Sequence, residues 1–460
     1  MPEGVFGRSD AELDFLVRSR RTGIAIVGFG YIGTVIGAVL ADRGWPVTGI
    51  DVRSNIVDEF NLGKTTVPEP GLQEMVATNV RVGRLGATTD FAAIADNHFI
   101  IVTVGTPLGS DFEPIVDDIT AAARAVGEHL RAGHMVILKS TVPPDATEKL
   151  VKPILEQTSG LTAGVDFGLA FSPERLAEGQ AIGELTSIPM VVGAIDEHSA
   201  RACSTLWRHA LGVDSIVVDD PRTAELAKLA DNVWIDLNVA LANELAKVCD
   251  RLGMDVLQVI AAANSMPKGD HNVNILRPSM GVGGYCLTKD PWFVNYLGQS
   301  LGLDLAIPRT SRTVNDTMPD YTCRLLEQLL ADQGKTLKGS TIAVLGIAFK
   351  NNTGDCRFTP TKPVLALLEE SGCDLSVHDP WVSDEEAHTV TKIPLTPDIE
   401  AAVKDADALV VLAGHRQFHQ IPLDWLAELA VPRCVFLDGR NSFDPAAVRA
   451  AGFTYKGIGR

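Results

Sequence analysis

The sequence predicts an α/β protein in which two Rossmann-like, doubly wound domains are joined by a long central helix. Short β-rich runs alternate with alanine-rich helical segments up to about residue 220, which is typical of a parallel sheet covered on both faces. The stretch 223–252 then runs without Gly or Pro, and a second β-rich series opens at residue 341. A chain of 460 residues with 46% hydrophobic residues is long enough for two or three domains.

The first domain is expected over residues 21–220, behind a polar N-terminal extension at 1–20 that has helical character and no assigned function. Its first strand is predicted at 23–27, where the residues are mostly apolar and β-branched. Further strands are predicted at 46–51, 99–104, 134–139, 167–171, 188–193 and 215–218.

A glycine triplet with the GxGxxG spacing directly follows the first predicted strand, because residues 28–33 read GFGYIG. Gly28 permits a tight turn, Gly30 lets a pyrophosphate approach the backbone, and Gly33 lets the following helix pack close to the strand. The N-terminus of that helix favours phosphate groups. The pattern predicts a dinucleotide site, and a purely structural glycine turn is the alternative.

Asp51 ends the next predicted strand and indicates which dinucleotide is bound. A carboxylate at this point accepts a hydrogen bond from the ribose 2′-hydroxyl and repels a 2′-phosphate, so NAD is favoured over NADP. Arg53 lies nearby and could accommodate a 2′-phosphate, so it weakens this preference slightly.

Residues 221–325 are expected to form a central helical and dimerisation region that begins with one long helix over 223–252. Apolar residues recur there at spacings of three and four, namely Leu226, Leu229, Val233, Leu237, Leu241, Leu245 and Val248. About thirty residues at roughly 1.5 Å each make a helix about 45 Å long. Such a helix suits a spine between two domains and a contact between subunits, although an ordinary buried helix has the same pattern.

Cys286 is the candidate nucleophile, since the glycine-rich segment 281–291 delivers it to a predicted helix start. Asp290 suits the N-cap of that helix and Pro291 its first helical position. Unpaired N–H groups at a helix start favour negative charge, and the thiolate is the reactive form of cysteine. The spacing therefore indicates a covalent catalyst, whereas the plain alternative is a buried apolar cysteine.

Lys228 and Asn232 lie four residues apart on the long helix and therefore share a face. A partly desolvated lysine is a better proton acceptor, and an amide beside it can donate to a developing oxyanion. A solvated helix edge would look the same. The segments 140–143 and 172–175 each end a predicted strand, at the edge where open α/β sheets bind ligands.

The C-terminal domain is expected over residues 326–460, with strands at 341–346, 374–378, 407–412 and 434–437. Its opening IAVLG resembles the IAIVG of the first domain, but the glycine triplet is missing. We therefore expect a similar fold that does not bind a dinucleotide in the same way.

Composition narrows the possible functions. The net charge of −18 argues against nucleic acid as a partner. We expect no membrane association, since no run of about 18 apolar residues occurs and the N-terminus has no signal-peptide pattern. The seven cysteines are scattered without a CxxC pair, which argues for a reducing, cytoplasmic setting and against a metal site.

Nine motifs in order carry a resemblance to a known family. They are GFGYIG, VPEPGL, STVPP, SPERLAEG, AELAKLADN, GVGGYCLTKD, AFK, TGD and DGR, and they span nearly everything after the first twenty residues. With these motifs the chain resembles the UDP-glucose/GDP-mannose dehydrogenase family. The resemblance implies that the C6 hydroxyl of a UDP-sugar is oxidised twice to a carboxylate, with NAD as acceptor and no release of the aldehyde. It also implies a homodimer or a higher homo-oligomer.

The resemblance also implies roles for individual residues. The expected catalytic residues are Cys286, Lys228, Asn232, Asp290, Glu174 and Thr141. The expected cofactor-binding residues are Gly28, Gly30, Tyr31, Ile32, Gly33, Asp51, Arg53, Thr106, Thr141, Glu178 and Arg357. The expected substrate-binding residues are Arg175, Lys228, Asn232, Leu276, Arg277, Ser279, Gly283, Phe349, Lys350 and Arg440. Lys228 would act either as a base or as an electrostatic stabiliser of the reacting oxygen.

Some positions depart from the pattern of UDP-glucose members. Arg175 stands where those members usually have Phe, and it resembles the branch that acts on 2-acetamido sugars such as UDP-N-acetyl-D-mannosamine. Lys289 and Tyr285 are less typical of that branch. His271 and Asn272 lie where the family often supplies an Arg to a neighbouring subunit. The sequence therefore favours an acetamido sugar, with UDP-glucose and UDP-N-acetylglucosamine as alternatives.

Two other functions fit parts of the sequence. A non-catalytic nucleotide-sugar sensor would bind ligand without producing NADH. A two-electron 3-hydroxyacid-type dehydrogenase would share the first domain and a helical lysine–asparagine pair. It would need neither Cys286 nor a second α/β domain, and both are in this sequence.

Overall fold

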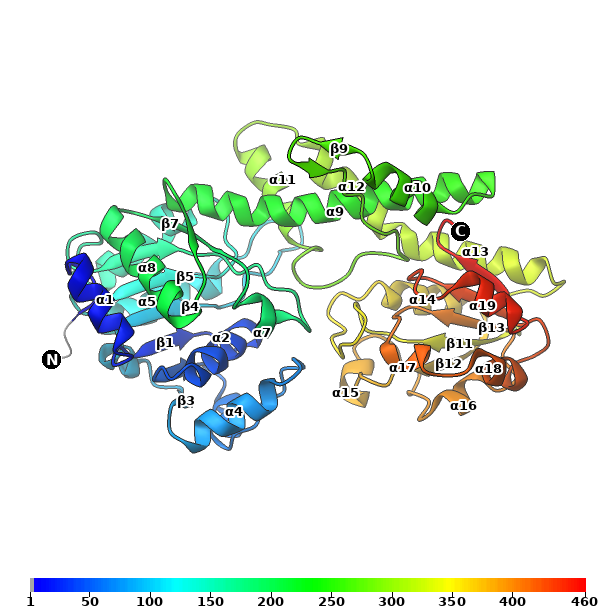
Figure 1. Ribbon diagram of the computed structural model, residues 1–460, viewed down its shortest axis with the longest axis horizontal. Coiled ribbons are helices and arrows are strands. Elements are labelled where there is room, and N and C mark those ends of the chain that lie inside the picture. The colour runs from blue at the N-terminus through cyan, green and yellow to red at the C-terminus, as the bar shows by residue number, and fades with distance from the viewer. Residues whose placement is uncertain (1–3) are drawn as a thin grey trace. The chain divides into compact units, whose positions relative to one another are not determined.

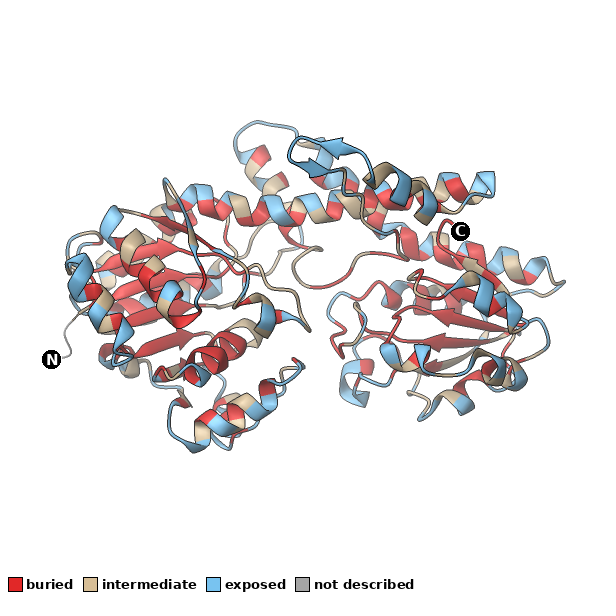
Figure 2. Cartoon of the chain, in the orientation of Figure 1, coloured by how far each residue is buried: buried red, intermediate tan, exposed pale blue. Residues whose placement is uncertain are grey.

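The computed structural model describes residues 4–460 and confirms the α/β prediction. The chain forms two compact units that divide between Asp231 and Asn232. Each unit is built on one sheet covered by helices (Figure 1). The strands of both sheets are largely buried, as expected for sheets covered on both faces (Figure 2).

The N-terminal sheet has the strand order β3-β2-β1-β4-β5-β6-β7-β8, and every pair is parallel except β6–β7. Its strands are β1 (Ile24–Val27), β2 (Val47–Ile50), β3 (Leu85–Thr88), β4 (Phe99–Val102), β5 (Met135–Leu138), β6 (Gly168–Phe171), β7 (Met190–Ala194) and β8 (Ser215–Val218). Seven of these strands match the sequence prediction. The eighth, β3, was missed because its sequence LGAT has only one buried residue.

The helical segments of this unit cover the sheet. They are α1 (Asp10–Arg18), α2 (Tyr31–Asp42), α3 (Ser54–Asn61), α4 (Leu72–Arg81), η1 (Phe91–Asp96), α5 (Asp117–His129), η2 (Thr147–Val151), α6 (Lys152–Ser159), α7 (Ala181–Glu184) and α8 (Glu197–Ala210). The N-terminal extension is packed against the unit, since Val5 and Phe6 are buried and both donate backbone N–H bonds to the Gly133 carbonyl. Leu13 and Val17 of α1 are buried as well.

The long helix α9 (Pro221–Leu252) confirms the predicted element and starts slightly earlier than expected. The predicted apolar stripe of this helix is only partly buried. Leu229 is buried, whereas several large apolar residues of the helix are exposed. The exposed ones are Leu226, Trp234, Leu237, Leu241, Val248 and Leu252. No described helix within residues 4–460 combines the length and apolar character that a bilayer span requires.

The C-terminal unit has a five-stranded parallel sheet in the order β12-β11-β13-β14-β15. Its strands are β11 (Thr341–Leu345), β12 (Asp374–His378), β13 (Ala408–Val411), β14 (Val435–Asp438) and β15 (Thr454–Gly457), beside a short pair β9 (Pro267–Lys268) and β10 (His271–Asn272). Its helices are α10 (Val256–Asn264), α11 (Asp290–Ser300), α12 (Ala306–Asp316), α13 (Met318–Ala331), α14 (Thr361–Ser371), α15 (Asp384–Ala387), α16 (Ile399–Val403), α17 (Arg416–His419), α18 (Leu423–Leu429) and α19 (Pro445–Ala450).

Candidate active site

The carboxyl edge of the N-terminal sheet gathers the predicted residues of that unit. Gly28 follows β1 and Asp51 follows β2, while Thr106, Thr141 and Glu174 follow β4, β5 and β6. These five strands are mutually parallel, so their carboxyl ends lie on one edge. The Thr106 hydroxyl donates to the Thr141 carbonyl at 2.5 Å and joins two of these loops.

The glycine turn has the geometry that a dinucleotide needs. Gly28 has φ +91°, and a Cβ on Gly33 would lie 2.3 Å from the Gly28 carbonyl oxygen. On Gly30, by contrast, a Cβ would meet no described atom nearer than Arg53 Nη2 at 4.0 Å, so the backbone is open to a ligand. Helix α2 begins at Tyr31, Ile32 lies in its first turn, and no described side chain caps its N-terminus. These features fit a pyrophosphate.

Asp51 is buried at the end of β2, where a ribose-binding carboxylate is expected. Its side chain accepts from the Phe29 backbone N–H at 2.9 Å and pairs with the Arg53 guanidinium at 2.9 Å. Burial opposes the charge, but the hydrogen bonds from Arg53 outweigh it and hold the pKa of Asp51 below its ordinary value. An ionised carboxylate here suits NAD.

A buried carboxylate outside the predicted set, Glu69, links three segments around the turn. It accepts from the Tyr31 hydroxyl, and from the Gly179 backbone N–H at 2.7 Å. The Tyr31 hydroxyl is therefore engaged within the protein, and Glu178 is the partly buried residue next to Gly179. The VPEPGL motif pointed to this segment, but no pattern in it showed that Glu69 would reach the other two.

Buried charges support the loops after β5 and β6. Lys228 Nζ lies 4.0 Å from Glu174 Oε2, and both side chains are at least nine-tenths buried. Lys139, outside the predicted set, donates through Nζ to the Ser172 and Pro173 carbonyls at 3.1 and 3.2 Å. Burial lowers the pKa of Lys139 to about 8. Through these two hydrogen bonds, Lys139 connects the segment that carries Thr141 to the segment that carries Glu174.

Arg175 is held within its own unit. One guanidinium nitrogen donates to the Pro189 carbonyl at 2.5 Å, and another lies 3.7 Å from Asp231 Oδ2. Asp231 is half exposed, so this ion pair is screened and weak. The guanidinium therefore lies beside α9 at Asp231, about three turns into the helix.

In the C-terminal unit, Asp290 is fully buried between two partners. Asn232 Nδ2 donates to Asp290 Oδ2 at 2.5 Å, and Lys289 Nζ lies 2.8 Å from Asp290 Oδ1. Lys289 was not among the predicted residues, although the sequence reads Lys-Asp directly after the cysteine turn.

The prediction that Asp290 is an N-cap is wrong. Helix α11 has Lys289 as its N-cap and begins at Asp290, with Pro291 one position further in than predicted. The backbone N–H groups of Lys289 and Asp290 both donate to the Cys286 carbonyl, so a turn precedes the helix. Cys286 lies in this turn and is partly exposed, which removes the alternative of a sealed apolar cysteine.

The cysteine turn packs against the loop that follows β11. A Cβ on Gly283 or on Gly284 would lie 2.8 Å from atoms of the Phe349 side chain, so only glycine fits there. The Gly284 N–H donates to the Arg357 carbonyl at 3.2 Å. The two glycines just ahead of Cys286 thus pack against a loop that carries three predicted ligand-binding residues, Phe349, Lys350 and Arg357.

Other predicted substrate residues lie on segments tied to α9 or to this loop. The Leu276 and Ser279 N–H groups donate to side chains of α9 at 3.0 and 2.9 Å, and Arg277 between them is exposed. The Arg440 guanidinium donates to the Phe349 carbonyl at 2.9 Å and to the Leu412 carbonyl at 2.6 Å. The predicted set therefore forms two groups, one in each unit.

Comparisons with known proteins place both groups in one family. Models of the UDP-glucose/GDP-mannose dehydrogenase family match the NAD binding domain at residues 22–211, the central domain at 222–317 and the UDP binding domain at 343–445. A UDP-N-acetyl-D-mannosamine dehydrogenase of Pyrococcus horikoshii is 32% identical over 437 residues, covering 95% of this chain and 99% of that protein.

Solved structures agree. A UDP-D-ManNAc dehydrogenase structure from Pyrococcus horikoshii has a TM-score of 0.85 at 31% identity, covering 95% of this chain and 99% of that one. A UDP-glucose dehydrogenase from Pyrobaculum islandicum has a TM-score of 0.85 at 32% identity, covering 95% and 98%. The chain therefore belongs to the UDP-glucose/GDP-mannose dehydrogenase family and is an NAD-dependent nucleotide-sugar dehydrogenase.

Proposed function

We propose that this enzyme oxidises the C6 hydroxyl of UDP-N-acetyl-D-mannosamine to the carboxylate of UDP-N-acetyl-D-mannosaminuronate, in two steps of two electrons. The observation that carries the proposal is Cys286 itself, whose thiol is partly exposed. It lies four residues before Asp290, which is buried and hydrogen-bonded to Asn232. Both lie in the unit that contains the UDP binding domain. A two-electron dehydrogenase has no use for such a thiol.

In the first step the C6 hydroxyl loses its proton and the C6 carbon loses a hydride, which together convert the alcohol to an aldehyde. NAD accepts the hydride in each of the two oxidations. Lys228 takes up the hydroxyl proton or stabilises the oxygen that loses it, and the buried Glu174, 4.0 Å away, supports either role. Thr141, on the neighbouring loop, would assist proton movement through water.

In the second step the Cys286 thiolate adds to the aldehyde carbon and forms a thiohemiacetal. Loss of hydride converts this to a thioester, and water cleaves the thioester to release the carboxylate and restore the thiol. Asn232 would donate to the oxyanion, while Asp290, which accepts the Asn232 amide at 2.5 Å, would orient the attacking water.

The stoichiometry of NADH tests the covalent step. The wild-type protein should release two NADH per sugar, and Cys286→Ser should lose this full turnover. Cys373→Ser is the matched control, since Cys373 is the other partly exposed cysteine. One NADH per sugar from the wild-type protein, with free aldehyde, would contradict the thioester route. Ligand binding without any NADH would instead indicate a sensor.

The choice of an acetamido sugar rests on Arg175 and on the names of relatives. Relatives named for UDP-N-acetyl-D-mannosamine and for UDP-glucose match this fold equally well, so UDP-glucose and UDP-N-acetylglucosamine remain the alternatives. Arg175 favours an acetamido sugar because a guanidinium can donate to the acetamido carbonyl. NADH release should be compared across these three substrates and GDP-mannose. Arg175→Phe should raise KM for the acetamido sugars more than for UDP-glucose.

We also propose a homodimer or a higher homo-oligomer in the cytoplasm, and the domain division 1–20, 21–220, 221–325 and 326–460. The exposed apolar row on α9 supports the homodimer, because such a row is suited to an interface between copies. The seven cysteines are scattered along the sequence without a CxxC pair, which suits a reducing compartment. Sedimentation of the purified protein would test the oligomeric state.

A further inference from the structure

The two sheets carry a carboxylate at matching positions. In the strand registers Ile50 pairs with the last residue of β1, and His378 pairs with the last residue of β11. Asp51 and Asp379 come directly after these two residues. Each accepts from the backbone N–H one residue beyond a positive-φ glycine, Phe29 at 2.9 Å and Ile347 at 2.7 Å. Asp379 is thus the counterpart of the expected ribose-binding carboxylate.

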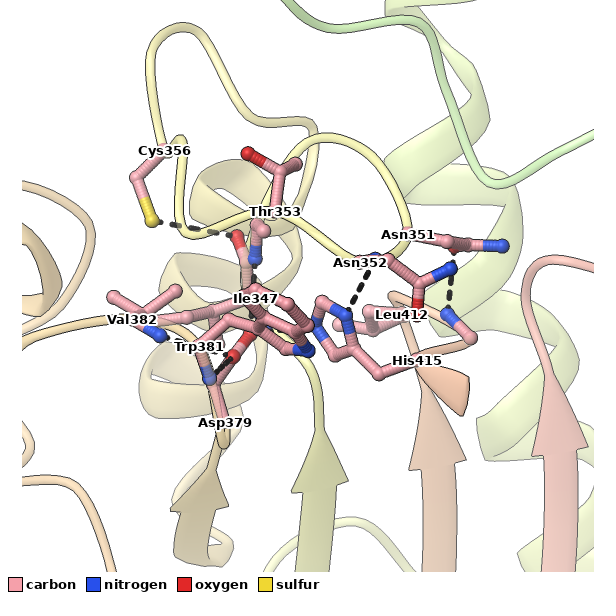
Figure 3. A network of polar contacts seen from close by, with 12 residues as sticks. Ile347, Asn351, Asn352, Thr353, Cys356, Asp379, Trp381, Val382, Leu412 and His415 are labelled. Atoms are coloured by element: carbon pink, nitrogen blue, oxygen red, sulfur yellow. Dashed lines mark hydrogen bonds and ion pairs between the residues drawn. The ribbon is translucent and has the colours of Figure 1, made fainter. Parts of the chain in front are cut away.

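The two units differ in the side chain that contacts the carboxylate, which is Asp51 in the first unit and Asp379 in the second. Val102 of β4 and Val411 of β13 are the paired neighbours of the two first strands, so four residues further on Thr106 corresponds to His415. His415 Nε2 lies 3.0 Å from Asp379 Oδ2, and both side chains are fully buried (Figure 3). Thr106 forms no such pair with Asp51 among the described contacts, because its hydroxyl donates to the Thr141 carbonyl.

Backbone groups take up the rest of the Asp379 carboxylate. Oδ2 also accepts from the Ala348 N–H, and Oδ1 accepts from the Trp381 and Val382 N–H groups at 2.8 and 3.2 Å. With His415 added, both oxygens are saturated inside the protein. A buried carboxylate so engaged has no acceptor left for a ribose hydroxyl.

The other nitrogen of His415 holds the loop after β11. The Asn352 N–H donates to His415 Nδ1 at 2.8 Å, which leaves the ring proton on Nε2, facing Asp379. Two flanking bonds run beside it, from the Gly414 N–H to Asn351 Oδ1 at 2.8 Å and from the Arg416 N–H to Asn352 Oδ1 at 2.7 Å. Asn352 has φ +59°, a conformation that needs such support.

We propose that His415 is a positioning residue for nucleotide-sugar binding. It bridges Asp379 to the segment 349–353, and so fixes the backbone that presents Phe349 and Lys350 to the substrate. The inference rests on the proposed role of that segment in binding the UDP end of the substrate. In this unit the carboxylate that would hold a ribose in a dinucleotide site is used to shape a different nucleotide site.

Binding of UDP and of NAD, each measured by calorimetry, tests the proposal. In His415→Ala, UDP binding should weaken at least about tenfold, as expected when a buried hydrogen-bonded bridge is lost, while NAD binding changes less than about twofold. His415→Asn keeps an oxygen near the Nδ1 position and should recover part of the loss. His419→Ala is the matched control, since His419 is exposed at the far end of the short helix α17, of which His415 is the N-cap. Backbone hydrogen exchange of segment 349–353 should accelerate in His415→Ala, should accelerate less in His415→Asn, and should stay unchanged in His419→Ala.

A His415→Ala protein that binds UDP as the wild type does would overturn the proposal. Equal losses of UDP and NAD binding would also overturn it, because they would reflect general unfolding. If exchange at 349–353 accelerates but the wild-type protein itself binds no UDP, the segment is not the UDP site and the proposed function fails instead. His415→Asn supplies the same readouts if His415→Ala does not fold.

Discussion

Replacing Asp51 by Asn should weaken the binding of NAD and improve the binding of NADP. Asn keeps an oxygen for the Phe29 N–H bond of 2.9 Å, so the glycine turn retains its support. The substitution removes the negative charge that repels a 2′-phosphate. It also releases Arg53, whose guanidinium pairs with Asp51 at 2.9 Å, and a free guanidinium is a good phosphate ligand.

The size of the effect follows from these contacts. A hydrogen bond to a charged group contributes about 1.5–3 kcal/mol, which corresponds to a loss of NAD affinity of roughly 10- to 100-fold. The Arg53 side chain is 53% exposed, so its pairing with a phosphate is screened by solvent. We therefore expect NADP affinity to rise by about fivefold, or about 1 kcal/mol.

The dissociation constants of both cofactors should be measured by calorimetry at two salt concentrations. The gain in NADP affinity should shrink at high salt and should vanish in the double variant Asp51→Asn/Arg53→Ala. If Asp51→Asn keeps its melting temperature but binds NADP no better than the wild type, the assignment of Asp51 to the ribose is wrong.

Two further predictions concern the same unit. Gly33→Ala places a Cβ 2.3 Å from the Gly28 carbonyl, so it should cost about 1–3 kcal/mol of stability in urea unfolding and abolish NAD binding, whereas Gly183→Ala, which meets nothing within 4 Å, should do neither. Burial lowers the pKa of His134 to about 4 from its ordinary 6.5. As the pH falls below 6.5 the unfolded chain takes up this proton first, so from pH 7 to pH 5 the wild type should lose about 2 kcal/mol more stability than His134→Asn. Equal losses in both proteins would show that His134 is not buried in its neutral form.

The sequence predicted the fold where burial leaves a continuous apolar run. Strands such as β1 and β5 are buried along their whole length and were found at nearly their observed bounds. The edge strands β3 (LGAT) and β15 (TYKG) were missed, because only one or two of their residues are buried and a glycine lies in each. The start of α11 was wrong by one residue, since Asp290 bonds to Asn232 instead of capping its own helix.

Local spacing predicted the positions of the Gly28 turn and Asp51 at strand ends and of Cys286 shortly before a helix, and the structure has them there. The roles of these residues stay predictions. The supporting residues Glu69 and His415 were not predictable, because their partners lie far away in sequence. Glu69 meets Gly179 across 110 residues, and His415 meets Asn352 across 63. No local pattern encodes such contacts.

The N-terminal segment that contains α1 matters for the design of truncated versions of this protein. The family model begins at residue 22, yet Val5 and Val17 are 1% and 0% exposed. A version cut at that boundary would uncover the surface of α8 that α1 contacts and the turn just before β5, where Val5 and Phe6 bind the Gly133 carbonyl. Such a truncated enzyme should aggregate, and a loss of activity in it would carry no information about catalysis.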